Sequence, residues 1–380
     1  MRRAVSKARD PDIALDELAG MLGGGPHALV LVFCSAAFEL ETLGRAIDRH
    51  FRGVLTVGCT TAGEITPEGY AEETITAVAF SPRVFTAAAA RVAPVSGFEL
   101  ADAQEVVARL QSELRYAAPD RAVGPDDMFA FVLSDGLARR EEAVTSMLAG
   151  ALAGMPLFGG SAGDDMRFER TGVYLDGAFH RDGAAIVLIA ADRPFKVFKT
   201  QHFVSTGQKM VVTEADPARR TVFEINASPA AEEYARIIGT SVDDLSPMLF
   251  ATHPVVVRVG GQDYVRAIQK ANPDGSLTFF CAIDQGIVLT LAEGGDLVEG
   301  LEALFSELRG EIGEPEIILG CDCVLRRLEA EQNQVKHEVS RLLRDNSVVG
   351  FCTYGEQYGA MHVSQTFTGV AIAARRRGDA

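Results

Sequence analysis

The sequence builds one strand-then-turn pattern twice and echoes it a third time. The three copies are VGCTTAGEI (57–65), LFGGSAGDD (157–165) and VVGFCTYGEQ (348–357). The first and third copies share the spacing G-x-x-T-x-G-E, and the middle one aligns with Ser161 opposite Thr61 and Asp164 opposite Glu64. Each copy ends an apolar run in glycines, hydroxyl side chains and a carboxylate. We therefore expect a fold with internal duplication.

The residues of these turns suit two interpretations. Glycine lets the backbone turn sharply or approach a ligand closely, hydroxyls bond freed backbone groups, and a carboxylate accepts two donors. The simpler interpretation is a recurring turn of a duplicated α/β fold. The second is the polar rim of one or two cavities between packed domains, a common place for ligands. In that case the carboxylates orient the turns or the ligand, and the ligand-binding candidates are Thr60, Thr61, Glu64, Ser161, Asp164, Thr353, Tyr354 and Glu356.

The middle copy also matches G-x-S-x-G, the nucleophile elbow of hydrolases, through its residues GGSAG. That motif requires a strand before the serine and a helix after it. The residues that follow, DDMRFERTGVYLDG, predict a turn into another strand instead. The sequence therefore favours a protein that is not an enzyme over an acyl hydrolase that uses Ser161.

Apolar runs of strand length alternate with amphipathic helical stretches along the chain. This alternation predicts a mixed α/β (α+β) fold of two packed, strand-rich domains. We expect an N-terminal tail and helix at 1–26, a first domain at 27–215, a second domain at 216–372 and a basic tail at 373–380. The segment 326–346 predicts one long helix with a polar face.

The charge balance limits the partners of the chain. With 36 basic and 52 acidic residues the formal net charge is −16, which disfavours binding to nucleic acid or to an anionic membrane surface. No apolar run reaches the length of a membrane span, and the basic N-terminus develops no secretory signal. These features predict a cytoplasmic protein whose partners are small molecules or other proteins.

The six cysteines lie mostly inside apolar runs, as small buried hydrophobes do in a reducing compartment. Only Cys321 and Cys323 are close together, and in a strand they project to the same face. A redox or metal role would need further ligands at zinc spacing, which the sequence lacks. A structural role is the favoured interpretation of this pair.

With these motifs in place, the chain resembles the FIST sensory-domain family, with an N-terminal and a C-terminal FIST domain. Besides the three turns, the resemblance rests on FEINASPAAEEYARIIG (223–239) and ILGCDCVLRRLE (318–329), in the family's order. It covers about residues 27–372. The resemblance implies a small-ligand sensor that signals through a partner, and amino acids are the general suggestion for the ligand.

A narrower branch of that family consists of haem-binding nitric-oxide sensors. The segments that resemble this branch are EADPARRTVFEINASPAAEEYARIIG, HPVVVRVGGQDYVRAIQKANPDGSLTFFCAID and TYGEQYGAMHVSQTFTGVAI. The resemblance implies non-covalent b-type haem, nitric oxide as the signal, and regulation of a histidine kinase or of a cyclic-di-GMP cyclase or phosphodiesterase. The absence of a C-x-x-C-H motif is compatible with non-covalent haem. Homo-oligomerisation is left open.

A gas-sensing haem needs one axial ligand, often histidine, and a displaceable position opposite it in an apolar pocket. We favour His362, which follows the third turn, as the ligand of the iron. A lone histidine beside an apolar strand can equally be a hydrogen-bonded structural residue. The other candidates around the haem are His202, His253, Met361, Tyr358 and Cys352.

The alternative is a haem-free FIST protein that binds an amino acid or a similar small metabolite. In that case arginine side chains and the turn hydroxyls should contact the carboxylate of the ligand. Haem uptake by the purified protein separates the two hypotheses.

Overall fold

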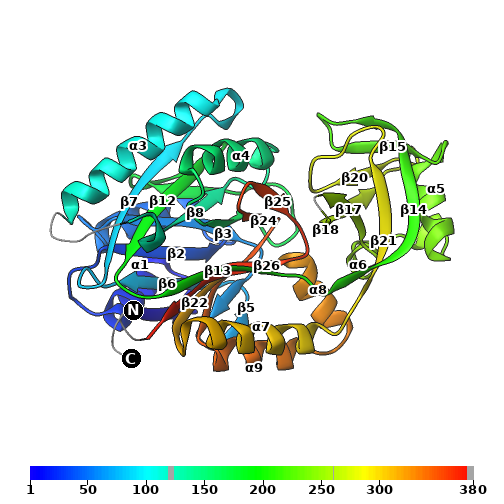
Figure 1. Ribbon diagram of the computed structural model, residues 1–380. Helices are drawn as coiled ribbons and strands as arrows, with labels where there is room; N and C mark the ends of the chain where they lie inside the picture. The colour runs from blue at the N-terminus through cyan, green and yellow to red at the C-terminus, as the bar shows by residue number, and fades with distance from the viewer. Residues whose placement is uncertain (119–123, 260, 375–380) are drawn as a thin grey trace.

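The computed structural model describes residues 1–118, 124–259 and 261–374, so most of the expected basic tail lies outside the described residues. Figure 1 shows a large body of sheets and helices, with a smaller strand-rich unit to one side. The predicted mixed α+β fold of two packed strand-rich units is thus confirmed. No helix within the described ranges is both long enough and apolar enough to cross a membrane.

The body consists of three repeats of one unit, and two neighbouring strands in each repeat run parallel. The first repeat contains β1 (Arg2–Ser6), α1 (Pro11–Leu22), β2 (Leu29–Ser35), α2 (Leu40–His50), β3 (Thr56–Thr61), β4 (Glu64–Thr66), β5 (Gly69–Ala71) and β6 (Ile75–Phe80). The second contains β7 (Phe85–Val92), η1 (Val95–Gly97), α3 (Leu100–Ala117), η2 (Pro125–Asp127), β8 (Met128–Ser134), α4 (Glu141–Leu152), β9 (Leu157–Ser161), β10 (Val173–Leu175), β11 (Ala178–His180) and β12 (Ala184–Ala191). The third contains β13 (Phe195–Thr200), α7 (Leu297–Ile312), β22 (Pro315–Cys323), α8 (Val324–Gln332), α9 (Lys336–Asp345), β23 (Val348–Thr353), β24 (Glu356–Tyr358), β25 (Met361–Val363) and β26 (Phe367–Ala373).

The three repeats exchange their hairpins in a closed cycle. The sheet orders are β1-β6-β2-β3-β10-β11, β7-β12-β8-β9-β24-β25 and β13-β26-β22-β23-β4-β5. The hairpin of the first repeat therefore completes the sheet of the third, that of the second completes the first sheet, and that of the third completes the second sheet. The repeated turns of the sequence lie where the chain leaves one sheet for another, which accounts for the duplication.

One glycine position is common to the three repeats. A Cβ at this position would lie closer than 3.0 Å to the carbonyl oxygen of the paired residue on the neighbouring parallel strand, so only glycine fits. The three glycines are Gly58, Gly159 and Gly350. They place Ser161 opposite Thr60 rather than Thr61, so the sequence alignment of the middle copy was wrong by one residue. The sequence alignment placed Asp164 opposite Glu64 because both are acidic. The contact of the common glycine with the neighbouring strand instead determines which residues of the three strands are equivalent.

The inner faces of the three sheets share one apolar core. Phe33 of β2 stacks on Phe351 of β23 with ring centroids 4.7 Å apart, and it meets Phe131 of β8 edge-on at 6.4 Å. The outer faces are covered by the helices of each repeat, namely α1 and α2, α3 and α4, or α7 and α9 (Figure 1). In α2, for example, Leu43 and Ile47 recur at helical spacing and are buried against the first sheet.

A strand-rich insert interrupts the third repeat between β13 and α7. It contains β14 (Phe203–Asp216), β15 (Thr221–Ile225), β16 (Ser228–Pro229), α5 (Ala230–Ile238), η3 (Val242–Asp244), α6 (Pro247–Thr252), β17 (Val255–Val259), β18 (Gln262–Arg266), β19 (Ile268–Ala271), β20 (Leu277–Phe279) and β21 (Val288–Gly294). The paired strands β14 and β21 carry the chain out of the body and back (Figure 1). The body and the insert therefore do not divide the chain at one position, and residue 215 lies within β14.

Two local predictions were wrong. The N-terminal segment expected as a tail contains β1, which pairs with β6 because Ala4 and Ser6 alternate inward from an edge strand. The single helix expected over 326–346 is two helices, α8 and α9, since Gln334 adopts a left-handed backbone conformation with φ of 61°. In addition, α8 is largely buried rather than polar-faced.

Candidate functional site

The insert packs on the body where the parallel strands β3, β9 and β23 end. A shared apolar cluster joins the two units at this junction; its members include Ala62, Cys323, Cys352 and Tyr354 of the body, and Phe203, Ala251, Val265 and Phe280 of the insert. Clefts between packed units are preferred places for small ligands. The junction is therefore the candidate region for a small-ligand site.

The turns of the first and third repeats form the same polar clasp. Thr61 donates its hydroxyl to Glu64 Oε1, and Thr74 donates both its backbone N–H and its hydroxyl to Glu64 Oε2. The third repeat makes the same bonds at the same spacing, through Thr353, Glu356 and Thr366. Each clasp fixes the chain at the point where it crosses between sheets.

The clasp carboxyls are completely buried. Burial raises the pKa of Glu64 to about 7 and that of Glu356 to about 8, although the hydrogen bonds from the threonines lower both. Thr60 likewise bonds within the protein, because its hydroxyl accepts from the backbone N–H of Gly172. The geometry of these predicted ligand-binding residues thus holds the turns in place.

The middle turn is built differently. Asp164 accepts a hydrogen bond from the Tyr354 hydroxyl and also from three backbone N–H groups, those of Phe168, Glu169 and Arg170. Ser161 Oγ accepts from Gln357 Nε2 at 2.9 Å and is fully buried. The next regular element after Ser161 is β10, so the strand–serine–helix geometry of a nucleophile elbow is absent, as the sequence predicted.

The exchanged hairpins create three equivalent niches, one on each sheet. Three side chains define each niche. Two belong to the residues that pair with each other in the middle of the hairpin. The third belongs to the central strand, two residues after the residue that pairs with the common glycine. In the first niche these residues are Tyr174, Phe179 and Cys34; in the second, Ile65, Tyr70 and Asp322; in the third, Gln357, His362 and Ser134. The first niche is apolar, with Tyr174 and Phe179 packed at a ring distance of 5.2 Å.

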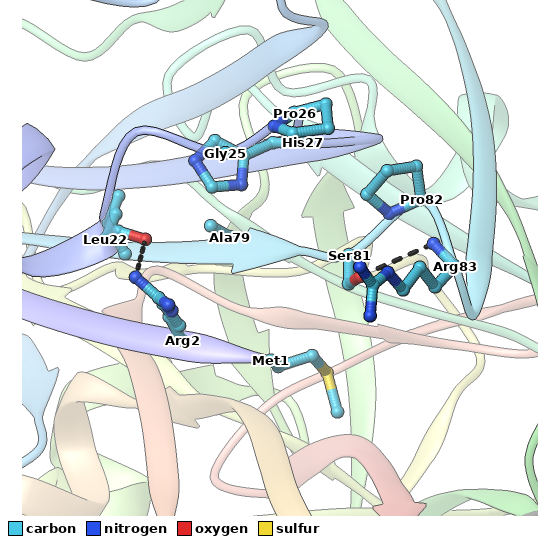
Figure 2. Close-up of a pocket in the computed structure, with 10 residues that line it drawn as sticks. All are labelled: Met1, Arg2, Leu22, Gly25, Pro26, His27, Ala79, Ser81, Pro82 and Arg83. Carbon is cyan, nitrogen blue, oxygen red and sulfur yellow. Dashed lines mark hydrogen bonds between the residues drawn. The ribbon is translucent and has the colours of Figure 1, made fainter.

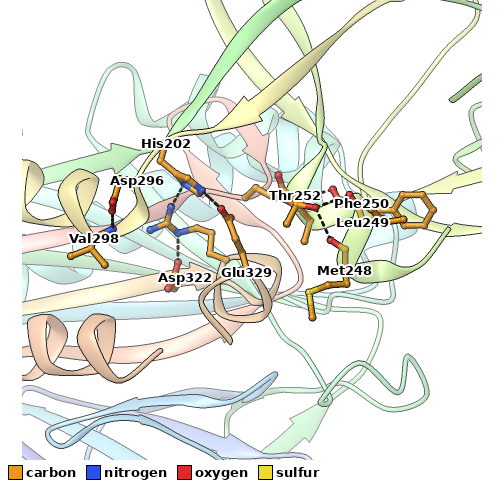
Figure 3. A network of polar contacts seen from close by, with 12 residues as sticks. His202, Met248, Leu249, Phe250, Thr252, Asp296, Val298, Asp322 and Glu329 are labelled. Carbon is orange, nitrogen blue, oxygen red and sulfur yellow. Dashed lines mark hydrogen bonds and ion pairs between the residues drawn. The ribbon is translucent and has the colours of Figure 1, made fainter. Parts of the chain in front are cut away.

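The second niche is polar, and its charged groups bond to one another. Tyr70 donates its hydroxyl to Asp322 Oδ2, and Arg326 Nε donates to Asp322 Oδ1 at 2.7 Å. Arg326 Nη1 donates to His202 Nδ1 at 2.8 Å, and His202 Nε2 lies 2.9 Å from both carboxylate oxygens of Glu329 (Figure 3). Because arginine can only donate, Nδ1 accepts and the proton of His202 lies on Nε2.

The second niche also anchors the insert. The backbone carbonyl of His202, where the chain enters the insert, accepts from the N–H of Gly295, where it leaves. Burial lowers the pKa of His202; the bond to Glu329 raises it and the charge of Arg326 lowers it further. His202 thus connects the two ends of the insert to α8: its carbonyl bonds to Gly295, and its neutral ring bonds to Arg326 and Glu329.

The third niche is polar but incomplete. Gln357 Nε2 donates to Ser161 and lies 3.4 Å from His362 Nδ1, which leaves the proton of His362 on Nε2. Three buried polar atoms of this niche have no hydrogen-bond partner: Ser134 Oγ, Gln357 Oε1 and His362 Nε2. Thr145 Oγ1, in helix α4 beside β25, has none either. None of these side chains is more than 4% exposed. Burial lowers the pKa of His362 to about 4, so the ring is neutral at pH 7.

Charged groups of α4 and of the insert surround the third niche. Arg220 of the insert donates Nη2 to Glu141 and to Glu142 of α4, at 2.7 Å in each case. Arg266 belongs to β18, which lies beside β25, and its Nε and Nη1 are buried without a hydrogen-bond partner. The charges of Glu142, Arg220 and Arg266 all act on the pKa of His362. The third niche therefore lies where the body meets the insert, near the unpaired donors of Arg266.

The predicted haem residues do not surround a haem-sized space in this conformation. The free, neutral Nε2 of His362 is chemically suited to bind iron. However, a Cβ at Gly355 would lie within 3.0 Å of that atom, so the Gly355 backbone covers it. Both ring nitrogens of His202 are engaged. His253 Nδ1 bonds locally, 3.0 Å from the hydroxyl of Thr252.

The remaining haem candidates lie apart. Tyr358 lines an open groove of about 550 Å³ with Phe195 and Lys196, and no histidine lines that groove. Met361 is half-buried and pairs with Tyr358 at the end of the β24–β25 hairpin. Cys352 is packed in the apolar cluster of the junction. Across the described part of the chain, no group of three or more His, Cys, Asp or Glu side chains is placed to hold a metal ion, and this covers the Cys321 and Cys323 pair.

Another cavity, of about 440 Å³, lies at the edge of the first sheet (Figure 2). His27 and Arg2 line it, but both bond to backbone carbonyls: His27 Nε2 to Gly23 at 3.1 Å and Arg2 Nη1 to Leu22 at 3.0 Å. It contains none of the predicted site residues. The third niche, by contrast, combines predicted and unpredicted residues.

The sequence interpretation missed several residues of the junction. They are Ser134, Thr145, Arg220, Arg266 and Gln357. Gln357 is the last residue of the third copy of the turn, and Arg266 interrupts an apolar strand pattern, so both carried a local signal. Ser134 and Thr145 carried none, because their significance depends on which hairpin packs against them.

Comparison with protein families gives two matches in sequence order. A model of the FIST N domain matches residues 28–228, and a model of the FIST C domain matches residues 230–359. The first match alone covers more than half of the chain. A search of curated proteins finds no match.

Proposed function

Because the chain belongs to the FIST family of sensory-domain proteins, we propose that it detects a small ligand at the third niche, between body and insert. The supporting observation is the contrast among the three equivalent niches. The first is apolar and the second is internally bonded, whereas three buried polar atoms of the third have no partner. Buried polar groups are nearly always hydrogen-bonded, so such a group of three supports a place for a further molecule.

The ligand acts by changing how the insert sits on the body. His362 and Gln357 belong to the body, while Arg220 and Arg266 belong to the insert. A ligand that contacts both units favours one arrangement, and it can drive a response only through such a difference in affinity. A separate histidine kinase or cyclic-di-GMP enzyme is the proposed recipient of the response, on the strength of the resemblance.

The protein is proposed to be non-catalytic. Ser161 is fully buried, and its hydroxyl accepts from the side-chain amide of Gln357, whereas a nucleophilic serine donates its hydroxyl to a basic side chain. A serine nucleophile needs a neighbouring base to remove its proton. Turnover of a generic ester that disappears in Ser161→Ala would contradict this part of the proposal.

Haem with nitric oxide as its signal remains the second candidate, supported by the neutral, unpaired Nε2 of His362. It requires Gly355 to move away from the ring. An absorption spectrum of the protein mixed with haem, as ferrous form and then with nitric oxide, tests it. A stoichiometric Soret band that shifts with the gas and is lost in His362→Ala would establish this candidate, whereas weak uptake without saturation would eliminate it.

The leading candidate is tested by thermal-shift measurements on haem-free protein with a panel of organic acids, amino acids, sugars and nucleosides. A saturable rise in Tm with one class, reduced in Gln357→Leu, is the expected result. Rises that are the same in wild type and in Gln357→Leu, or none at all, would contradict a ligand site at the third niche.

A further inference from the structure

We infer that the ligand of the third niche carries a carboxylate, which Arg266 of the insert binds against Ser134 and His362 of the body. This inference rests on the proposed function, because it assumes that a small ligand enters this niche. It goes further in naming the chemical group that is recognised and the residue that supplies the charge.

The second niche already contains the arrangement that the third lacks. There Asp322 supplies a carboxylate from the central strand, Arg326 donates to one of its oxygens and Tyr70 donates to the other. In the third niche Ser134 holds the position of Asp322 and His362 that of Tyr70. The third niche therefore has a hydroxyl where its counterpart has a carboxylate.

An arginine without a carboxylate accompanies that difference. Arg266 Nε and Nη1 have no partner, whereas Arg326 is bonded to Asp322 and His202. Unpaired, buried guanidinium donors are costly, and a carboxylate is the partner whose geometry and charge fit them best. A carboxylate brought by a ligand would complete the third niche as Asp322 completes the second.

The two arginines of the insert differ in their partners. Arg220 is shared by Glu141 and Glu142 of α4. Arg266 Nε and Nη1 have no hydrogen-bond partner within the described residues. The two oxygens of a carboxylate match this pair of donors, and its single negative charge offsets the charge of one guanidinium.

The neutral groups of the niche fit the same ligand. The Ser134 hydroxyl can donate to a carboxylate, and so can the His362 Nε2–H once the Gly355 backbone moves off the ring. Gln357 Oε1 can only accept, so it suits a hydroxyl or amino group elsewhere on the ligand. The inferred class is a small carboxylate that also carries a hydrogen-bond donor.

Matched probes test the inference by calorimetric titration of the full chain. The probes are acetate, lactate and glycine, the neutral amides acetamide and lactamide, and inorganic phosphate. We expect saturable binding of lactate or glycine, weaker binding of acetate, and none of the amides. Binding of amides as strong as that of carboxylates, or a preference for phosphate, would overturn the inference.

Two variants and one control locate the binding. Arg266→Gln should weaken carboxylate binding about tenfold or more, since it removes a charged donor. Arg258→Gln, on the neighbouring strand β17, should leave it unchanged, because Arg258 is exposed and pairs with Asp263. Equal binding by wild type and Arg266→Gln would overturn the inference.

Ser134→Asp gives the most specific test, because it introduces the carboxylate that the second niche has. We expect this variant to lose lactate and glycine binding while keeping or raising its Tm. Unchanged binding by folded Ser134→Asp would overturn the inference. If that variant does not fold, the comparison of carboxylates with amides decides. Saturable binding of a neutral compound from the thermal-shift panel would overturn only the inference that the ligand carries a carboxylate. Absence of any binding would contradict the proposed function as well.

Discussion

Tyr70 and His362 hold the same position in two exchanged hairpins, yet only Tyr70 has its polar group bonded. The Tyr70 hydroxyl donates to Asp322, while His362 Nε2 has no hydrogen-bond partner. The two residues are related by the internal repetition of the body, so each niche serves as a control for the other. The difference between them is the basis of the proposed ligand site.

The clasp carboxyl of Glu356 makes stability depend on pH. Burial raises its folded pKa to about 8, above the ordinary glutamate pKa of 4.5. The folded state therefore binds the proton more tightly, and the stabilisation present below about pH 4.5 is lost as the pH rises to about 8. We expect Glu356→Gln to remove part of this loss, which is on the order of 5 kcal/mol at most.

Urea unfolding at about pH 5 and about pH 8.5 measures this effect. The wild-type free energy of unfolding should fall between the two values more steeply than that of Glu356→Gln. Equal slopes for the two proteins would show that Glu356 is ionised throughout.

The glycine shared by the repeats should tolerate no side chain. In Gly159→Ala the new Cβ would lie within 3.0 Å of the carbonyl oxygen of Val132, so the parallel strands must separate. We expect a loss of about 2 kcal/mol or more in the free energy of unfolding. Gly20→Ala in the exposed part of α1 is the control, because nothing lies within 4 Å of its Cβ. It should be neutral or stabilising by up to about 1 kcal/mol; a similar loss in both variants would refute the close approach.

The second niche should hold the insert in place. In Asp322→Asn a buried carboxylate that pairs with Arg326 is lost, at a cost of about 3 kcal/mol. Limited proteolysis should then cut faster near His202 and Gly295, where the chain enters and leaves the insert. Glu302→Gln, at an exposed position of α7, is the control and should be cut at the wild-type rate. An unchanged rate of cleavage in Asp322→Asn would show that the second niche does not hold the insert in place.

The His362 ring should stay neutral to an unusually low pH. Burial lowers its pKa to about 4; the charge of Glu142 opposes this, and those of Arg220 and Arg266 reinforce it. Because the folded pKa is depressed, stability is complete above about pH 6.5 and is lost as the pH falls towards 4. The ring carbon signals of His362 in NMR, assigned with His362→Gln, should not titrate above about pH 5. A midpoint near 6.5 would mean that the ring is open to solvent.

Much of the fold follows from sequence patterns. The alternation of apolar runs and amphipathic helices correctly predicted elements such as β8, α4 and β23, and the repeated turn indicated duplication. The exchange of hairpins could not be predicted, because the short strands β4 and β24 carry no signal for the sheet they join. Strand β1 was missed for a similar reason, since an edge strand has few apolar residues.

The candidate site was predicted only in part. His362 and Ser161 stood out because they lie in or beside the repeated turns. Ser134 and Arg266 belong to segments far apart in the sequence, and their meaning depends on unpaired atoms that only three-dimensional packing reveals. The haem interpretation relied on which residues are histidines. The sequence did not reveal that the backbone of Gly355 packs against the His362 ring.

Hydrogen–deuterium exchange with and without saturating lactate tests the central claim most directly, because the three niches are measured in one experiment. We predict slower exchange in residues 356–366 of the third niche and in β18 of the insert. Residues 64–71 and 173–180, in the second and first niches, should not change. Protection spread equally over the three hairpins, or none in 356–366, would contradict a single ligand site between the body and the insert.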